Sequence, residues 1–165
     1  MSTRRYTELR GADTASDCDF AIVVARFNAE ITEGLLAGAL TTLADASVGD
    51  ERITIVRVPG AYEIPMAALK LAESGRFDAV ICLGCLIKGD TMHFEYIAEA
   101  TAHGIMDAAA ATGVPIAFGV LTTLTDEQAD VRSKPGPENK GREAALAAVE
   151  MATLFRRLAQ QGPTP

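Results

Sequence analysis

The chain has few residues of the kinds that build a disulfide framework or a metal centre, and its charge does not suit nucleic acid. Its 165 residues include three cysteines and two histidines, and no metal site is expected. Lysine and arginine total 15 against 22 aspartate and glutamate, a formal net charge of −7. Because a general nucleic-acid surface is basic, we expect no nucleic-acid partner, and an anionic ligand must be held locally.

Long apolar runs are also missing. None is long enough to span a bilayer, and residues 1–6 (MSTRRY) lack the apolar core of a secretory signal, so we expect no membrane role. Three unevenly spaced cysteines favour a reducing compartment, with the cytoplasm as the expected location. A hydrophobic content of 48% fits one globular domain over residues 18–159, between flexible ends at 1–17 and 160–165.

Short apolar runs alternate with long alanine-rich segments. The runs predict strands at 20–25, 53–58, 79–87 and 114–120. The segments predict helices at 28–46, 63–74, 91–112, 126–131 and 140–159. Nearly all-apolar strands separated by helices indicate a four-stranded parallel sheet flanked by helices, which is a flavodoxin-like, three-layer α/β/α sandwich.

Ligands of such sheets bind beyond the carboxyl ends of the strands, so the turns there are the candidates for chemistry. In the first turn, Phe27 either stacks on a flat ring or caps the core, and Asn28 is expected to cap the following helix. In the second, Gly60 brings the backbone close to a ligand, with Tyr62 as an aromatic wall. Glu63 either binds that ligand or complements the helix dipole.

The third turn, residues 84–91, has the glycine spacing of a phosphate-binding P-loop. Asp90 stands where that motif needs lysine, which makes a nucleoside triphosphate a poor fit. Thr91 and the free N–H groups of a helix N-terminus suffice for one phosphate monoester if a cation approaches. Asp90 beside a phosphate is unfavourable unless it caps the helix. Arg132 and Lys140, after the fourth strand, are candidate cations or merely solvated side chains.

His93 lies in the first turn of the third long helix. The helix dipole there disfavours the imidazolium and favours a neutral base, although a lone histidine is more often structural. His103 is interpreted as a packing or surface residue. Cys82 and Cys85 have C-x-x-C spacing inside an apolar strand, where residues three apart point to opposite faces, so we interpret them as core residues rather than a redox pair.

Four segments together resemble the lumazine synthase family over nearly the whole chain. They are VPGAYEIP at 58–65, IKGDTMHFEY at 87–96, FGVLT at 118–122 and NKG at 139–141. The resemblance implies condensation of 5-amino-6-(D-ribitylamino)uracil with 3,4-dihydroxy-2-butanone 4-phosphate to 6,7-dimethyl-8-ribityllumazine, the penultimate step of riboflavin biosynthesis. No cofactor is then required.

The resemblance also implies the residues of the site. Stacking on the pyrimidine falls to Phe27, and proton transfer falls to His93. The pyrimidine edges and ribityl chain are assigned to Ala61, Tyr62, Glu63, the backbone of Cys85, Leu86 and Ile87, and Phe118. The phosphate is assigned to Asp90, Thr91 and Arg132, with support from Lys140 and Glu143.

The chain departs from the family pattern at a few positions. Tyr62 stands where many members have phenylalanine, and Asp90 where a small residue is common. The stretch 133–138 departs more strongly. Neither single change removes a group that the reaction needs.

The resemblance further implies a homopentamer with active sites between subunits. Some members assemble twelve pentamers into a hollow icosahedral, sixty-subunit shell, and riboflavin synthase is a further expected partner. The lack of an insertion between Arg132 and Lys140 favours the shell, while Pro135 and Pro137 alter that loop.

Two rival interpretations stay open. A non-catalytic flavin- or lumazine-binding module would use the same aromatic pocket, and a structural shell subunit would keep it as a vestige. A pure binder needs neither His93 nor Arg132, so these two residues discriminate between the interpretations.

Overall fold

Four parallel strands form the centre of the protein, as seen in a computed structural model that describes residues 5–162. The strands are β1 (Phe20–Ala25), β2 (Ile53–Val58), β3 (Ala79–Ile87) and β4 (Ile116–Thr123), in the order β2-β1-β3-β4. In the central strand, Phe20 pairs with Ile53 of β2 and with Ala79 of β3. Parts of both expected flexible ends, residues 1–4 and 163–165, lie outside the described residues.

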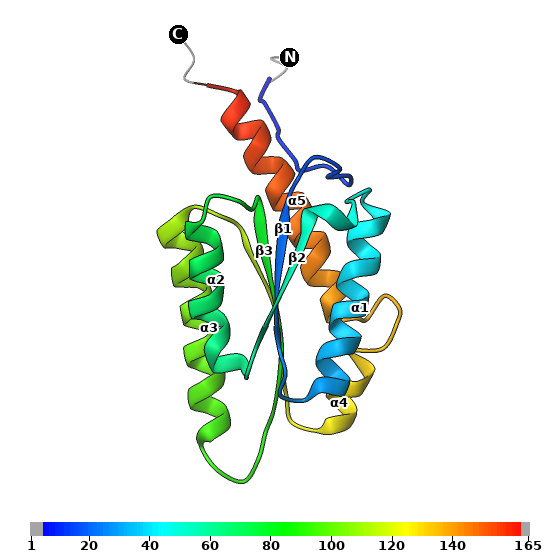
Figure 1. Cartoon of the computed structure of the whole chain (residues 1–165), viewed down its shortest axis with the longest axis vertical. Coiled ribbons are helices and arrows are strands. Elements are labelled where there is room, and N and C mark those ends of the chain that lie inside the picture. Colours follow the sequence, from blue (N-terminus) through cyan, green and yellow to red (C-terminus); the bar gives the residue numbers. More distant parts are fainter. Residues whose placement is uncertain (1–4, 163–165) are drawn as a thin grey trace.

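Helices cover both faces of this sheet (Figure 1). One face carries α2 (Ile64–Glu73) and α3 (His93–Thr112), and the other carries α1 (Ala29–Asp45), α4 (Asp126–Val131) and α5 (Lys140–Gln160). Two short 3-10 helices, η1 (Asp50–Arg52) and η2 (Ala61–Glu63), precede and follow β2. The expected three-layer α/β/α arrangement is confirmed.

The side chains of β1 alternate between two cores, which explains why the whole strand is apolar. Phe20, Ile22 and Val24 belong to the cluster beneath α1 and α5. Ala21 and Val23 belong to the cluster beneath α2 and α3. Each fully buried large aliphatic side chain contributes about 2 kcal/mol of transfer free energy, so the sheet is a rigid base for the turns at its end.

The observed bounds differ from the expected ones mainly in β4. The strand was expected at 114–120, but it begins at Ile116 and continues to Thr123, because Thr122 and Thr123 pair with Leu86 and Ile87 of β3. Pairing with a long neighbour thus extends the strand beyond its apolar run. This places the end of β4 beside the end of β3.

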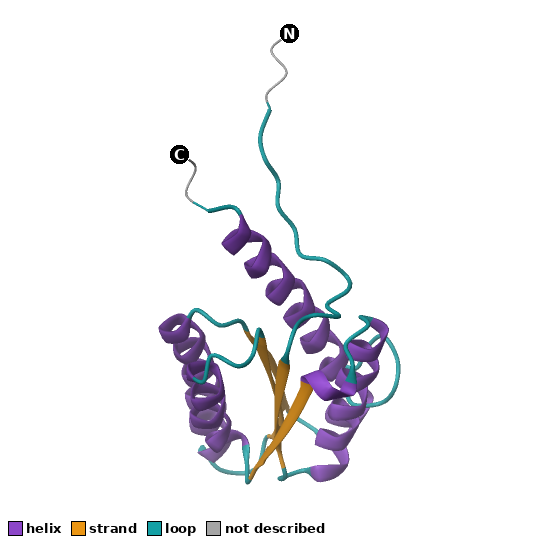
Figure 2. Cartoon of the chain, turned by 45° about the horizontal axis from the view of Figure 1, so that its top comes forward, coloured by secondary structure: helices purple, strands orange, loops and turns teal. Residues whose placement is uncertain are grey.

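The N-terminal segment runs alongside α5 (Figure 2). The Ala12 amide donates to Thr153 Oγ1 at 2.7 Å, and the Arg156 guanidinium bonds to both Asp17 and Asp78. These contacts lie at the amino ends of the strands, opposite the turns described below. Within residues 5–162, no helix has both the length and the apolar character needed to cross a membrane.

Candidate active site

The turns at the carboxyl ends of β1, β2 and β3 surround a cavity of about 540 Å³, which we call the first half-pocket. Three turns and α3 line it, through Phe27, Pro59, Gly60, Ala61, Tyr62, Glu63, Leu86, Ile87, Gly89, Thr91, His93, Phe94 and Ile97. Most of the residues expected around the pyrimidine therefore share one cavity with Thr91 and His93.

Backbone hydrogen bonds fix the turn that carries Phe27. The amides of Arg26 and Phe27 donate to the carbonyls of Val58 and Pro59 at 2.8 and 3.0 Å. Phe27 is 68% exposed, so it is not a core cap in this chain, and most of its ring is free to contact a ligand. Exposure of a large aromatic at a cavity wall is typical of a stacking residue.

Asn28 does not cap α1 with its side chain, and that prediction is wrong. The residue directly precedes α1 but adopts the left-handed conformation, with φ 58° and ψ 49°, and makes no side-chain capping bond. Its Nδ2 instead donates to the Cys85 carbonyl at 2.9 Å. Asparagine tolerates this backbone conformation better than most residues, and its amide here ties the first turn to the end of β3.

The second turn uses Glu63 to hold itself together. Glu63 Oε2 accepts from the Gly60 amide at 2.9 Å, which supports its structural interpretation. The buried Ala61 offers its carbonyl to Thr101 Oγ1 of α3 at 3.2 Å. Tyr62 is 62% exposed and is the large side chain that this turn presents to the cavity.

Cys85 was expected to meet the ligand through its backbone, but it does not line the first half-pocket, and its carbonyl accepts from Asn28 Nδ2. Its side chain is 2% exposed and packs in the core beneath α1 and α5, whereas Cys82 packs in the opposite core, so their predicted divergence is confirmed. Burial raises the pKa of the Cys85 thiol to about 11. A thiol held protonated in this way is a poor nucleophile at neutral pH.

The third turn ends later than expected, because α3 begins at His93 rather than at residue 91. Met92 takes the cap position and makes no side-chain capping bond. Asp90 therefore does not cap the helix, the one role that was expected to make its charge acceptable beside a phosphate. Asp90 is exposed and lies outside the lining of the first half-pocket. Thr91 and His93 line it at the helix start, where the first amides have no intrahelical partner.

Some neighbours of His93 were not predicted. Phe94 and Ile97 line the same cavity, and the helical spacing of 93, 94 and 97 on one face was the signal for them. Lys88 Nζ lies 2.8 Å from Glu95 Oε1 and holds the pKa of that carboxyl below its usual value. This ion pair links the turn to the first helical residues of α3.

A second cavity, of about 260 Å³, lies along the edge strand β4, and we call it the second half-pocket. Its lining comprises Phe118, Gly119, Val120, Leu121, Thr122, Thr123, Arg132, Lys140 and Glu143. No residue is shared with the first half-pocket. Phe118 was expected to complete the pocket of Phe27, but within one chain the two residues line different cavities. Phe118 lies on the edge strand and is 48% exposed.

The two cations of the second half-pocket line the same cavity, and a backbone hydrogen bond joins their residues. Arg132 Nη1 donates to the Gln128 carbonyl at 2.9 Å, and Lys140 Nζ pairs with Glu143. The Lys140 amide donates to the Arg132 carbonyl at 2.9 Å. Two cationic side chains that line one cavity suit a phosphate better than two isolated surface cations.

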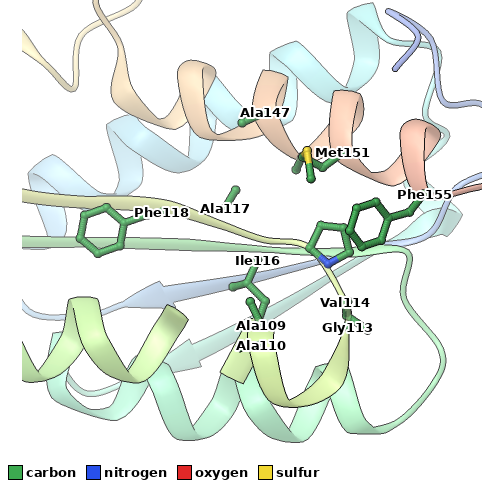
Figure 3. A pocket seen from close by; sticks show the side chains of 12 residues that line it. Ala109, Ala110, Gly113, Val114, Ile116, Ala117, Phe118, Ala147, Met151 and Phe155 are labelled. Atoms are coloured by element: carbon green, nitrogen blue, oxygen red, sulfur yellow. The ribbon is translucent and has the colours of Figure 1, made fainter. Parts of the chain in front are cut away.

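An apolar groove of about 450 Å³ continues from Phe118 along β4 (Figure 3). Met151 and Phe155 of α5 and Ala109 and Ala110 of α3 line it from either side. Phe118, Met151 and Phe155 are 38–48% exposed. Contiguous apolar surface beside a polar half-site is typical of an interface with another chain.

Among residues 5–162, no three histidine, cysteine, aspartate or glutamate side chains gather closely enough to hold a metal ion. The chemical groups at the two half-pockets are instead an imidazole, aromatic rings, helix-terminal amides and two cations. Such groups can stack a ring, bind a phosphate and transfer a proton.

The residues of both half-pockets lie within the part of the chain that matches a known family. A family model described as 6,7-dimethyl-8-ribityllumazine synthase matches residues 17–156. The chain is 48% identical over 152 residues to the protein of that name from Salinibacter ruber, covering 92% of this chain and 97% of the relative. It is 51% identical over 138 residues to 6,7-dimethyl-8-ribityllumazine synthase 1 of Caulobacter vibrioides, covering 84% and 90%.

Proposed function

Because this chain belongs to the 6,7-dimethyl-8-ribityllumazine synthase family, we propose that its active site is shared between two copies. The reaction is the condensation of 5-amino-6-(D-ribitylamino)uracil with 3,4-dihydroxy-2-butanone 4-phosphate to 6,7-dimethyl-8-ribityllumazine, a transferase step of riboflavin biosynthesis. In this proposal, the first half-pocket of one copy faces the second half-pocket of its neighbour.

One observation carries the proposal: the two sets of site residues line separate cavities of the same chain. His93 and Phe27 line the first half-pocket, and Phe118, Arg132 and Lys140 line the second. A reaction that joins an aromatic amine to a phosphorylated ketone needs both sets. Pairing across an interface supplies both without a change in the fold of either copy.

The pyrimidine occupies the first half-pocket in this proposal. Phe27 stacks on its ring, while Tyr62 and the backbone at Leu86 and Ile87 contact its edges. The ribityl chain runs along the second turn, at Ala61 and Glu63, where an exposed tyrosine hydroxyl and a carboxylate offer polar partners. Phe118 of the neighbouring copy then covers the ring.

The ketone phosphate binds between Thr91 of one copy and Arg132 of the other. The unpaired amides at the start of α3 donate to phosphate oxygens, and Arg132 and Lys140 supply positive charge. Asp90 adds a carboxylate nearby and has no capping role to offset its charge. We expect it to lower the affinity for this substrate relative to a small neutral residue.

The chemistry needs alignment and proton transfer. The pyrimidine amine attacks the ketone carbon, and loss of water gives an imine. Elimination of phosphate and closure of the ring by the ribitylamino nitrogen, with loss of water, then complete the product. His93, exposed at the start of α3, is placed to take and return these protons.

We propose a homopentamer as the assembly that closes the site. The apolar groove along β4 adjoins the second half-pocket and lies open in a single chain, as an interface would. The loop at 133–138 carries no insertion, and this favours further assembly of pentamers into a shell. Riboflavin synthase is the proposed partner, since the reaction is the penultimate step of riboflavin formation.

The proposed location is the cytoplasm. Cys18, Cys82 and Cys85 are all buried free thiols, as a reducing compartment permits. Residues 18–159 are proposed to act as one domain, because a single sheet organises both cores. Its substrates are small molecules.

The first experiment is a fluorescence assay of lumazine formation from the two substrates, with complementation between variants. His93→Ala and Arg132→Ala each lower activity, and co-refolding them in equal amounts should restore about a quarter of the wild-type sites if each site spans two copies. A mixture no more active than the mean of the two variants would place both residues in one chain's site. Tight lumazine binding without product in the wild type would favour the binding-module interpretation.

A further inference from the structure

A buried polar side chain lies between the two cations and has no part in the chemistry above. Asn139 is 1% exposed and directly precedes α5. It follows the loop that begins after Arg132 and directly precedes Lys140. Buried amides carry a large desolvation cost unless their groups are satisfied, so the contacts of this side chain indicate what it does.

The Asn139 side chain is bonded at both ends. Its Nδ2 lies 2.8 Å from the Ser133 carbonyl and 3.0 Å from the Lys134 carbonyl, and 3.1 Å from the Gly34 carbonyl on α1. Its Oδ1 accepts from the Arg142 amide at 3.0 Å and so caps α5. One side chain thus joins the start of the loop, the start of α5 and the body of the protein.

The neighbouring helix leaves this side chain little room. A Cβ atom added to Gly38 of α1 would lie 2.2 Å from Asn139 Oδ1, and one added to Gly34 would lie 2.5 Å from the Ser133 carbonyl oxygen. Serine at position 139 could still cap α5 but could not reach the three carbonyls. Aspartate would present a second oxygen to them instead of a donor.

We infer that Asn139 is a positioning residue for the phosphate of the ketone substrate, acting by fixing the loop that lies between Arg132 and Lys140 and sets their relative positions. The Lys140 amide donates to the Arg132 carbonyl and so joins the two ends of the loop. Asn139 Nδ2 donates to the carbonyls at the start of the loop. The inference rests on the proposed function, in which these two cations meet the phosphate. Displacement of the loop should weaken phosphate binding and leave the pyrimidine half untouched.

The test is Asn139→Ser in the assembled protein, with steady-state kinetics for each substrate and inhibition by inorganic phosphate. We expect the KM for the ketone and the inhibition constant of phosphate to rise about tenfold, with the KM for the pyrimidine changed less than about twofold. Thr153→Ala is the matched control, because this buried residue lies farther along α5 and bonds to the Ala12 amide. It should lower thermal stability without moving either KM.

A second variant covers the case in which Asn139→Ser does not fold. Gly38→Ala keeps Asn139 but displaces its side chain from α1, and it should show the same split between the two KM values. A folded variant of either kind with an unchanged ketone KM would overturn the inference. If Arg132→Ala also left the ketone KM unchanged, the proposed phosphate site itself would fail; a large effect of Arg132→Ala beside none at Asn139 would remove only the positioning role.

Discussion

The two half-pockets are built in different ways. The first is assembled from consecutive strand ends that bond to one another, with Phe27 donating to Pro59 and Asn28 to Cys85. The second joins an edge strand to a loop, and that loop is anchored through Asn139 to α1, about a hundred residues away in the chain. The first is therefore fixed by the sheet, and the second depends on long-range contacts.

This difference matches the different tasks that we propose for the two half-pockets. In the proposed site, the first half-pocket carries the imidazole and the aromatic ring that stacks on the pyrimidine, and both must be aligned with the reacting atoms. In the same proposal, the second half-pocket carries cations that hold the phosphate but do not contact the atoms that exchange protons, so displacing them weakens binding of the ketone rather than the chemical steps. Changes in the first half should therefore alter turnover, and changes in the second should alter substrate affinity.

The largest effect is expected for His93→Ala. Loss of the proton-transfer group should lower kcat about a hundredfold while binding of the lumazine product changes little. The measurement is lumazine fluorescence under saturating substrates, with product affinity from equilibrium titration. His103→Ala is the matched control, since this second histidine is exposed on the same helix and lies outside both half-pockets.

Equal losses of turnover and of product affinity in His93→Ala would count against a proton-transfer role. They would show that the side chain mainly shapes the cavity. The two half-pockets would then differ in how they are built but not in whether they act on turnover or on affinity.

A smaller effect, on affinity, is expected for Arg132→Ala. Removal of a charged phosphate contact should raise the KM for the ketone about tenfold and leave the KM for the pyrimidine unchanged. Arg142→Ala serves as the control, because this arginine is exposed two residues beyond Lys140 and lies outside the second half-pocket. A parallel rise in both KM values would mean that Arg132 supports the interface rather than the phosphate.

Much of the fold followed from local patterns in the sequence. The bounds of β1, β2, β3 and α4 agree with the apolar runs and with the short segment after β4. The β4 bounds could not be predicted in the same way, because Thr122 and Thr123 join the strand through pairing with β3. Polar residues extend a strand only when a neighbour is already in place.

The site shows the same limit. The turns after the predicted strands pointed to Phe27, Tyr62 and His93, and these three residues do line one cavity. The side-chain role of Asn28 was missed, since capping is a local rule and its partner lies on β3. The separation of Phe118 from that cavity within one chain was also missed. Because β4 continues to Thr123, Phe118 lies beside Cys82 in the middle of the sheet and not in a turn at its end.

The smallest catalytic effect is expected at Cys85, which lies at the boundary of the first half-pocket but turns its thiol into the core. Cys85→Ala should leave kcat and both KM values unchanged, since this residue packs in the core and does not line the first half-pocket, and should cost about 1 kcal/mol of stability. Burial raises the pKa of the folded thiol to about 11, above the value of about 8.5 for an unfolded cysteine. The unfolded chain therefore loses this proton first, so the stabilising contribution is complete below about pH 8.5 and disappears as the pH rises toward 11.

Thermal unfolding between neutral pH and pH 10 should show a shallower loss of stability in Cys85→Ala than in the wild type, with equal kinetics. A kinetic defect in Cys85→Ala with an unchanged alkaline stability profile would place the thiol in the site.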